Sequence, residues 1–218
     1  MAKENNLTIP KTVRYFSQGN PKTAKYVWLV LHGYGQLPEY FIRKFASLSP
    51  EEHFVIAPEG MHRFYLEGTQ GRVGASWMTK VARTDDIHDN IVYLNALCER
   101  LSPEIGAKKK ILLGFSQGGA TAARFHQLGH WSAAVFVLWG SVFPPDLQLP
   151  SQNGTYADSS NFILLGNEDP YYGEEEKTKL LDHLKHEQLD FQYLPYDGGH
   201  TVTAEALTEL VKMIDKTH

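Results

Sequence analysis

The chain has 218 residues, of which 42% are hydrophobic and 21% are charged, so it is long enough to bury most of its surface and is not composed like a disordered protein. Its formal net charge of −4 at pH 7 gives no electrostatic reason to expect a nucleic acid or an anionic membrane as a partner. The single cysteine, Cys98, excludes an internal disulfide.

The amino-terminal residues lack the apolar core of a signal peptide. The most hydrophobic stretch, residues 26–31, is too short to cross a bilayer. We therefore expect a soluble, cytoplasmic protein made of a single domain over residues 1–218, without stable membrane association.

Seven apolar, β-branched or aromatic runs predict strands, at residues 13–16, 26–31, 54–57, 111–115, 133–139, 162–165 and 191–194. The middle runs are continuously apolar, which is typical of strands covered on both faces. A turn-forming cluster at residues 19–22 predicts a hairpin between the first two strands.

Helical patterns separate the later strands. The first is preceded by Thr84 and two aspartates, and its apolar face carries Cys98; two more follow later in the chain. Their apolar positions are Ile87, Ile91, Leu94, Cys98 and Leu101, then Leu180, Leu181 and Leu184, then Leu207, Leu210, Val211 and Ile214. Strands that alternate with helices predict an α/β domain with a mostly parallel sheet. Residues 108–110, which are three lysines, and residues 143–161 are interpreted as surface loops.

A glycine-flanked serine lies between a predicted strand and a predicted helix, in the sequence Gly114-Phe115-Ser116-Gln117-Gly118. This is the nucleophile-elbow pattern, in which a strained tight turn exposes the serine hydroxyl and glycines remove the side chains that would clash. The pattern alone is short enough to occur by chance. The same glycines partly match a phosphate-binding loop, but Ala120 stands where that loop needs its lysine.

A serine nucleophile needs a base, and the base needs an orienting acid. Asp169 follows the predicted strand 162–165, and His200 lies between the last predicted strand and the last helix, which gives the order Ser, acid, His of α/β-hydrolases. Glu168 and Asp197 are alternative acids. A further possibility for Asp169 is a simple turn residue before proline.

The segment His32-Gly33-Tyr34-Gly35 ends the second predicted strand and is similar to the oxyanion loop of esterases. We expect the backbone amides of Tyr34 and Gln117 to point at the space above Ser116, where negative charge would develop during acyl transfer. His32 is interpreted as a residue that braces this loop rather than as a catalytic base.

These segments resemble the phospholipase/carboxylesterase family of α/β-hydrolases, which includes carboxylesterases and acyl-protein thioesterases. The resemblance extends from about residue 13 to the carboxyl terminus and depends on LHGYG, GASWM, GFSQGG, GNEDP and the GGH turn. It implies an α/β-hydrolase fold with helices on both faces of the sheet, a small or absent lid and no cofactor.

The resemblance also implies the roles of single residues. Ser116 would be the nucleophile, Asp169 the orienting acid and His200 the base, with the oxyanion hole formed by the amides of Tyr34 and Gln117. The chain departs from the thioesterase branch at Gln36, where that branch has Asp, and at Tyr171 and Tyr172, where it has small apolar residues. These departures argue against an acyl-protein or long-chain lipid substrate.

Residues 59–80 are expected to form a long glycine-punctuated loop near the serine. Its apolar side chains are candidates for a substrate pocket, with ordinary core packing as the alternative, which suits Trp77 best: Phe64, Tyr65, Leu66 and Trp77. Arg63 and Arg72 in the same loop could meet an anionic group of the substrate, although arginines exposed to solvent are the commoner case. His183 and His186 have helix-face spacing but no third ligand, so no metal site is predicted.

The sequence therefore predicts a serine carboxylesterase that hydrolyses small-molecule esters through an acyl-enzyme intermediate. Thioesterase or lysophospholipase activity on longer acyl chains is the alternative within enzymes. A non-catalytic binding module with this fold is the alternative from another class. The sequence leaves open whether the protein forms a homodimer.

Overall fold

The structure is a computed structural model that describes every residue except 1, 145, 148–153, 188 and 218. Its centre is a seven-stranded sheet with the strand order β1-β3-β2-β6-β7-β8-β9. The strands are β1 (Tyr15–Gln18), β2 (Tyr26–Leu31), β3 (His53–Pro58), β6 (Lys109–Phe115), β7 (Val135–Trp139), β8 (Ser160–Gly166) and β9 (Phe191–Tyr196). Only β1 runs antiparallel to its neighbour, and all other neighbours are parallel.

Two further strands, β4 (His62–Glu67) and β5 (Gln70–Ser76), form a separate antiparallel hairpin. The helices are α1 (Pro38–Phe41), the 3₁₀ helix η1 (Ile42–Phe45), α2 (Arg83–Ile105), α3 (Gln117–Leu128), α4 (Glu174–His186) and α5 (Ala204–Lys216). Among the described residues, no helix is long and apolar enough to cross a membrane.

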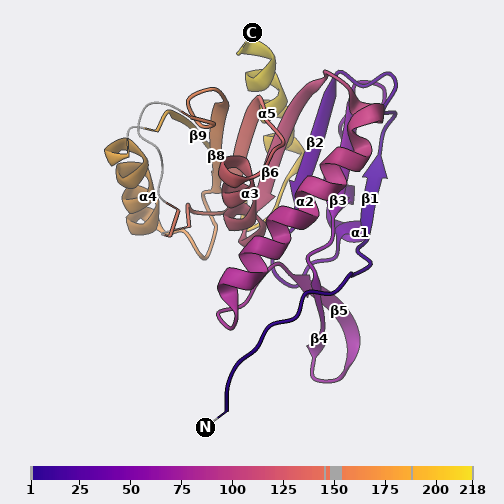
Figure 1. The fold of residues 1–218 in the computed structure, drawn as a ribbon. Helices are drawn as coiled ribbons and strands as arrows, with labels where there is room; N and C mark the ends of the chain where they lie inside the picture. Colours follow the sequence, from indigo (N-terminus) through magenta and orange to yellow (C-terminus); the bar gives the residue numbers. More distant parts are fainter. Residues whose placement is uncertain (1, 145, 148–153, 188, 218) are drawn as a thin grey trace.

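Helices cover both faces of the sheet, as predicted. Figure 1 shows α2, α3 and α4 on the near face and α5 on the far face. Because side chains alternate along a strand, Leu29 of β2 packs with the core under α2, α3 and α4, whereas Trp28 packs with the core under α5 and α1. The predicted mostly parallel α/β fold is confirmed.

The predicted hairpin between the first two strands is wrong. Strand β1 pairs with β3, and β3 lies between β1 and β2 in the sheet. The turn after β1 packs on the segment that leads into β3, since the Asn20 amide donates to the Pro50 carbonyl and a Cβ on Gly19 would lie 2.0 Å from the His53 carbonyl oxygen. A local turn signal shows that the chain reverses, but it does not show which strand will pair with which.

The expected long loop at residues 59–80 is also wrong in part. Residues 62–76 form the β4–β5 hairpin, whose turn has left-handed backbone at Gly68 (φ +63°) and is followed by Gly71 with φ +87°. From the sequence, these glycines are interpreted as part of a loop, whereas in the structure they lie at and beside the turn of a hairpin. The hairpin projects from the edge of the sheet at which the parallel strands end (Figure 1).

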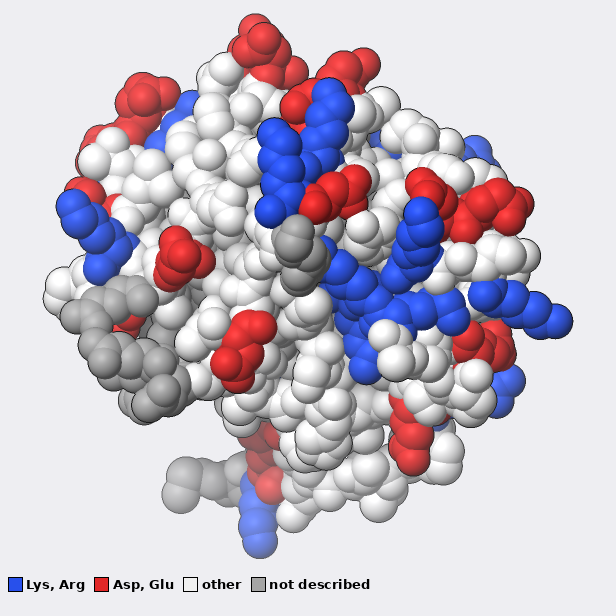
Figure 2. Space-filling model, turned by 90° about the horizontal axis from the view of Figure 1, so that it is seen from above, with Lys and Arg blue, Asp and Glu red and all other residues white. Residues whose placement is uncertain are grey.

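Two of the three lysines at residues 108–110 belong to strand β6 rather than to a loop. The Lys109 ammonium donates to the carbonyl of Ile214, and the Lys110 ammonium lies over the Trp131 ring. Figure 2, seen from the edge at which the parallel strands begin, shows Lys and Arg side chains gathered near the middle of this face, with Asp and Glu around them.

Three helices carry the predicted apolar positions. Leu94, Cys98 and Leu101 of α2 are buried, as are Leu180 and Leu184 of α4 and Leu207, Leu210 and Ile214 of α5. Burial raises the pKa of the Cys98 thiol to about 12. Thr84 is not the N-cap of α2, because the helix begins after Ala82, which has φ +51°.

The segment 143–161 is not wholly a surface loop. Phe143 and Tyr156 are buried and pack against Phe136 of β7. The part of this interpretation that concerns residues 145 and 148–153 lies outside the described residues.

Candidate active site

Ser116 stands in a strained turn at the end of β6 and the beginning of α3. Its backbone has φ +53° and ψ −123°, a conformation that residues with a side chain rarely adopt. Its amide donates to the carbonyl of Trp139, and its carbonyl accepts from the Ser141 hydroxyl at 2.8 Å. These contacts with β7 and with the residues that follow it hold the turn in place.

Two glycines of the elbow are required by close approach. A Cβ on Gly114 would lie 2.5 Å from the Cα of Gly119 and 2.6 Å from the carbonyl oxygen of Gly118. A Cβ on Gly118 would lie 2.3 Å from the carbonyl oxygen of Leu31. The sequence argument anticipated the first contact, whereas the second, between the start of α3 and the end of β2, requires the tertiary structure.

Asp169 and His200 meet beside the elbow. The His200 Nδ1 lies 2.7 Å from the Asp169 Oδ2, and the other carboxylate oxygen, Oδ1, accepts from the Tyr171 amide at 3.0 Å. Because a carboxylate only accepts hydrogen bonds, Nδ1 carries the proton and the lone pair of His200 lies on Nε2. The Asp169 side chain is fully buried.

The imidazole of His200 is positioned by aromatic packing against the elbow. Its ring centroid is 4.9 Å from that of Phe115, the residue before Ser116. Tyr171 contacts the ring edge-on at 4.7 Å. Within the described residues the Ser116 hydroxyl makes no hydrogen bond, so transfer of its proton to His200 belongs to the mechanism proposed below.

The two alternative acids lie elsewhere. Asp197 is exposed and accepts from the Asn167 side chain at 2.9 Å, which ties the turn after β8 to the turn after β9. Glu168 is exposed. Asp169 is therefore the carboxylate that the fold brings to His200.

The loop after β2 lies directly against the elbow. A Cβ on Gly33 would lie 3.2 Å from the Cβ of Ser116, so the backbone of this loop passes very close to the serine. Within the described residues, neither the Tyr34 amide nor the Gln117 amide donates a hydrogen bond to a protein acceptor. Gln117 is the first residue of α3, where the helix leaves its amides free and its dipole favours negative charge.

The His32 side chain connects this loop to the residue Gly60, which follows β3. Its Nε2 accepts from the Gly60 amide at 2.9 Å, so its Nδ1 carries the proton and donates to the Gly33 carbonyl at 2.8 Å. The ring is fully buried, and burial lowers the pKa of His32 to about 4. The side chain is thus a neutral spacer between β2 and the residues that follow β3.

The Gln117 side chain connects the elbow to the end of β5. Its Oε1 accepts from the Trp77 amide at 3.0 Å, and its Nε2 donates to the Met78 carbonyl at 2.9 Å. The Trp77 indole in turn donates to the His32 carbonyl at 2.8 Å. One side chain therefore fixes the segment that follows the hairpin next to the proposed oxyanion hole.

The four expected pocket residues lie in different surroundings. Trp77 is fully buried in the core, Phe64 contacts Tyr34 in a tilted arrangement with 5.0 Å between ring centroids, and Tyr65 is exposed. Leu66 lines a cavity of about 490 Å³ together with residues from the oxyanion loop, α1, η1 and β5: Gly35, Gln36, Leu37, Tyr40, Phe41, Lys44, Arg72 and Val73. Of the four expected pocket residues, Leu66 alone lines this cavity.

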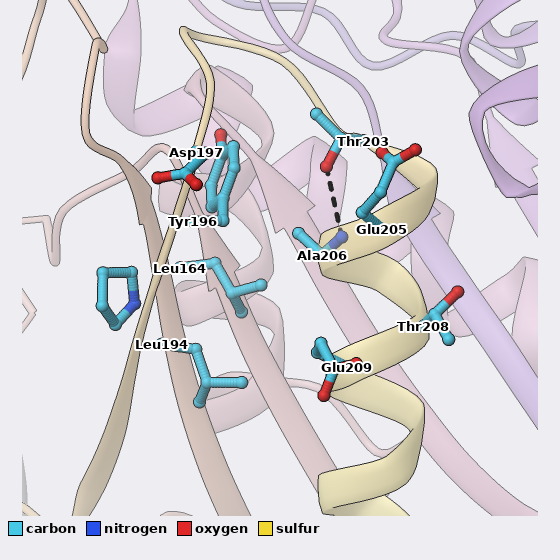
Figure 3. A pocket seen from close by; sticks show the side chains of 10 residues that line it. Leu164, Leu194, Tyr196, Asp197, Thr203, Glu205, Ala206, Thr208 and Glu209 are labelled. Atoms are coloured by element: carbon cyan, nitrogen blue, oxygen red, sulfur yellow. Dashed lines mark hydrogen bonds between the residues drawn. The ribbon is translucent and has the colours of Figure 1, made fainter.

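A second cavity of about 670 Å³ lies between β9 and α5, next to the loop that carries His200 (Figure 3). Its floor is apolar at Leu164 and Leu194, and its rim carries Asp197, Glu205 and Glu209. No Lys or Arg of the described chain lines it. The two cavities therefore differ in charge, with cations in the first and carboxylates in the second.

Several residues that hold the site were missed from the sequence. Ser141 supports the Ser116 carbonyl, and Gly140 has φ +53° at a position where a Cβ would lie 3.0 Å from the His200 ring. The Gln36 side chain accepts from the Gly33 amide, and the Lys44 ammonium donates to the Thr201 hydroxyl at 3.0 Å. The only sequence signal was the position of Gly140 directly after a strand.

No group of three or more His, Cys, Asp or Glu side chains in the described part of the chain is arranged to hold a metal ion. His183 and His186, the pair with helix-face spacing, are both exposed on α4.

Comparison with known proteins finds one family model that matches nearly the whole chain. The family model described as Phospholipase/Carboxylesterase matches residues 16–218. No curated protein sequence matches the chain significantly.

Solved structures of esterases and a thioesterase share the fold. A carboxylesterase from Bacillus cereus is 20% identical with a TM-score of 0.69, over 94% of this chain and 95% of that one. A carboxylesterase from Mesorhizobium loti is 17% identical with a TM-score of 0.72, over 93% and 94%. Acyl-protein thioesterase 2 from Zea mays is 19% identical with a TM-score of 0.70, over 93% and 98%.

Proposed function

The chain belongs to the phospholipase/carboxylesterase family, and from this premise we propose that it is a serine carboxylesterase that hydrolyses small-molecule esters. The observation that carries the proposal is the strained backbone of Ser116 next to the hydrogen-bonded pair of Asp169 and His200. A strained residue persists only where the surrounding fold enforces it, and such residues cluster at active sites.

Acylation follows from the hydrogen bonds of His200. With Nδ1–H donated to Asp169, Nε2 accepts the proton of the Ser116 hydroxyl while the serine oxygen attacks the ester carbonyl. The negative charge that develops on the carbonyl oxygen is stabilised by the amides of Tyr34 and Gln117, each of which is typically worth ~3 kcal/mol of barrier. His200 then protonates the leaving alcohol, and Ser116 remains acylated.

Deacylation repeats these steps with water. His200 removes a proton from a water molecule, which attacks the acyl-enzyme carbonyl, and the same two amides stabilise the second oxyanion. Collapse of this intermediate releases the carboxylic acid and returns the proton to Ser116. The buried Asp169 stabilises the protonated His200 in both halves of the cycle.

The test is hydrolysis of p-nitrophenyl esters from acetate upward, combined with labelling by a fluorophosphonate probe. We expect turnover, labelling of Ser116 alone, and loss of both in Ser116→Ala. Full activity of Ser116→Ala, or labelling at another residue, would contradict the proposal. Absence of both labelling and turnover would favour a non-catalytic binding module with this fold.

Action on longer acyl chains is the second candidate, as a thioesterase or lysophospholipase. It is supported by exposed apolar side chains on the loop after β2, on strand β4 and after β7, which are Tyr34, Leu66 and Val142. A profile of kcat/KM against acyl-chain length, on oxygen esters and on thioesters, separates the two candidates. A steady rise beyond eight or so carbons would favour the second.

A further inference from the structure

Two side chains that line the 490 Å³ cavity beside the oxyanion loop, Lys44 and Arg72, are positively charged and have no carboxylate partner among the described residues. Among the described residues, Arg72 makes no hydrogen bond and no ion pair, and Lys44 donates only to the Thr201 hydroxyl. Arg63, on the same hairpin, is different because Glu59 binds its guanidinium at 2.5 Å. The hairpin thus carries one arginine that is neutralised within the protein and one that is not.

This cavity lies against the proposed reaction centre. Gly35 and Gln36 line it, and they directly follow Tyr34, whose amide we assign to the oxyanion hole. Phe41 lines it as well and stacks on Phe115, the neighbour of Ser116, at 5.9 Å between ring centroids. Lys44, which also lines the cavity, donates to the hydroxyl of Thr201, the residue that follows His200.

The wall of this cavity combines hydrocarbon surface with two cations. Leu37, Phe41, Leu66 and Val73 provide the hydrocarbon surface, while Lys44 comes from η1 and Arg72 from β5. The carboxylates on the neighbouring elements, Glu39 and Glu67, are not among the lining residues. An occupant with a short hydrocarbon segment and a negative charge would therefore match this cavity.

The cavity on the other side of the His200 loop has the opposite charge. Asp197, Glu205 and Glu209 surround it (Figure 3), so an anion would be repelled there. The charges of the two cavities therefore differ in sign, and the cavity with Lys44 and Arg72 is the one of the pair that favours an anion.

We infer that the natural ester carries an anionic group, a carboxylate in the simplest case, which Arg72 and Lys44 bind in the cavity between the oxyanion loop and the β4–β5 hairpin. This inference rests on the proposed esterase function and specifies its substrate class. Arg72 presents the planar donor pair that matches a carboxylate, and Lys44 adds a second positive charge.

The test compares matched esters that differ in charge. On the acyl side, the mono-p-nitrophenyl ester of glutaric acid is compared with p-nitrophenyl hexanoate. On the alcohol side, 4-carboxyphenyl butyrate is compared with 4-carbamoylphenyl butyrate. We expect the anionic ester of one pair to have the higher kcat/KM, and the pair in which this occurs identifies the half of the substrate that occupies the cavity.

The charge variants attribute this preference to the two cations. In Arg72→Gln and in Lys44→Gln, the ratio of kcat/KM for the anionic ester to that for the neutral ester falls about fivefold, and it falls further in the double variant. Arg72→Lys keeps the positive charge but loses the planar donor pair, so its ratio lies between those of the wild type and Arg72→Gln. Lys22→Gln, which removes one charge from the turn after β1, leaves the ratio as in the wild type. Added salt lowers the wild-type ratio, because exposed charges are screened.

The outcomes separate this inference from the proposed function. Hydrolysis of all four esters that depends on Ser116, with equal ratios in the wild type and in Arg72→Gln, would overturn the inference and leave the esterase function intact. A change in the ratio of equal size in Lys22→Gln would also overturn it, because a general field effect would then explain the preference. No hydrolysis of any ester would overturn both.

Discussion

The Oδ2 of Asp169 lies 2.7 Å from the Nδ1 of His200, although the two residues are 31 positions apart in the chain. The carboxylate is fully buried, whereas the imidazole is 18% exposed, so the acid lies behind the base and the base borders the site. This arrangement fixes the tautomer of His200 with its lone pair on Nε2, the atom that the proposed mechanism uses as the base.

We expect Asp169→Asn to lower kcat for p-nitrophenyl butyrate by about 10²- to 10⁴-fold. The amide removes the negative charge that stabilises protonated His200 and allows the tautomer with the proton on Nε2. Asp197→Asn is the matched control, since Asp197 contacts Asn167 instead of His200, and its kcat should change less than about threefold. A larger loss in Asp197→Asn than in Asp169→Asn would exchange the roles of the two acids.

Gly118→Ala should destabilise the fold by about 2 kcal/mol or more and abolish esterase activity. Alanine favours helices over glycine by ~1 kcal/mol, but here its Cβ would lie 2.3 Å from the Leu31 carbonyl oxygen, a backbone atom at the end of β2. Urea unfolding followed by fluorescence measures the loss.

Gly173→Ala is the control for this change. Gly173 precedes α4, and the nearest atom to its added Cβ is the end of the flexible Glu176 side chain at 3.0 Å. We expect the free energy of unfolding to change by less than about 1 kcal/mol. Equal losses in the two variants would show that close approach at the elbow does not decide the outcome.

Gln117→Ala should lower kcat for esters by about tenfold and destabilise the protein by about 1 to 2 kcal/mol. The backbone amide of residue 117 stays, but the Trp77 amide and the Met78 carbonyl lose the side chain that connects them to the elbow. Steady-state kinetics and urea unfolding measure the two effects. Gln70→Ala, at the exposed first residue of β5, should change neither, and an unchanged kcat in Gln117→Ala would show that this connection does not position the site.

The free energy of unfolding should decrease as the pH falls from 6.5 toward 4, because of His32. Burial lowers the pKa of His32 from 6.5 to about 4 in the folded state. Between these values the unfolded chain binds the proton and the folded chain does not, so acid favours unfolding, by about 3 kcal/mol over the full interval. His126, whose pKa burial also lowers to about 4, contributes in the same direction.

Urea unfolding at pH 7.0, 6.0 and 5.0 tests this dependence. In His32→Gln, one titrating group is gone, so stability should fall less steeply with decreasing pH, although the variant starts from a lower value. The range above pH 5 separates the histidines from the carboxylates, which take up protons at lower pH. The same slope in the variant and in the wild type would contradict the assignment to His32.

The order of the chemistry along the chain could be predicted from the sequence because it depends on local features. A buried parallel strand is continuously apolar, and a nucleophile turn needs glycine on both sides of its serine, so β6, Ser116 and α3 are recognisable from neighbouring residues. Asp169 and His200 were predicted in the same way, as polar residues that follow strands, and the structure places them in contact.

The pairing of β1 with β3, the hairpin β4–β5 and the choice between Asp169 and Asp197 required the tertiary structure. Each of them depends on contacts between residues far apart in the chain, which a local pattern does not specify. Trp77 illustrates the limit, because an aromatic residue near a glycine-rich turn suits a pocket wall as well as a core, and only packing shows that it is fully buried.

The sequence by itself determined the type of fold, the order of the candidate catalytic residues and the family to which they point, because backbone strain and apolar patterning are written in consecutive residues. The tertiary structure decided which carboxylate meets His200 and which cations remain unneutralised, Arg72 rather than Arg63. Charge neutralisation and burial depend on distances in space, and neighbouring positions in the chain do not fix those distances.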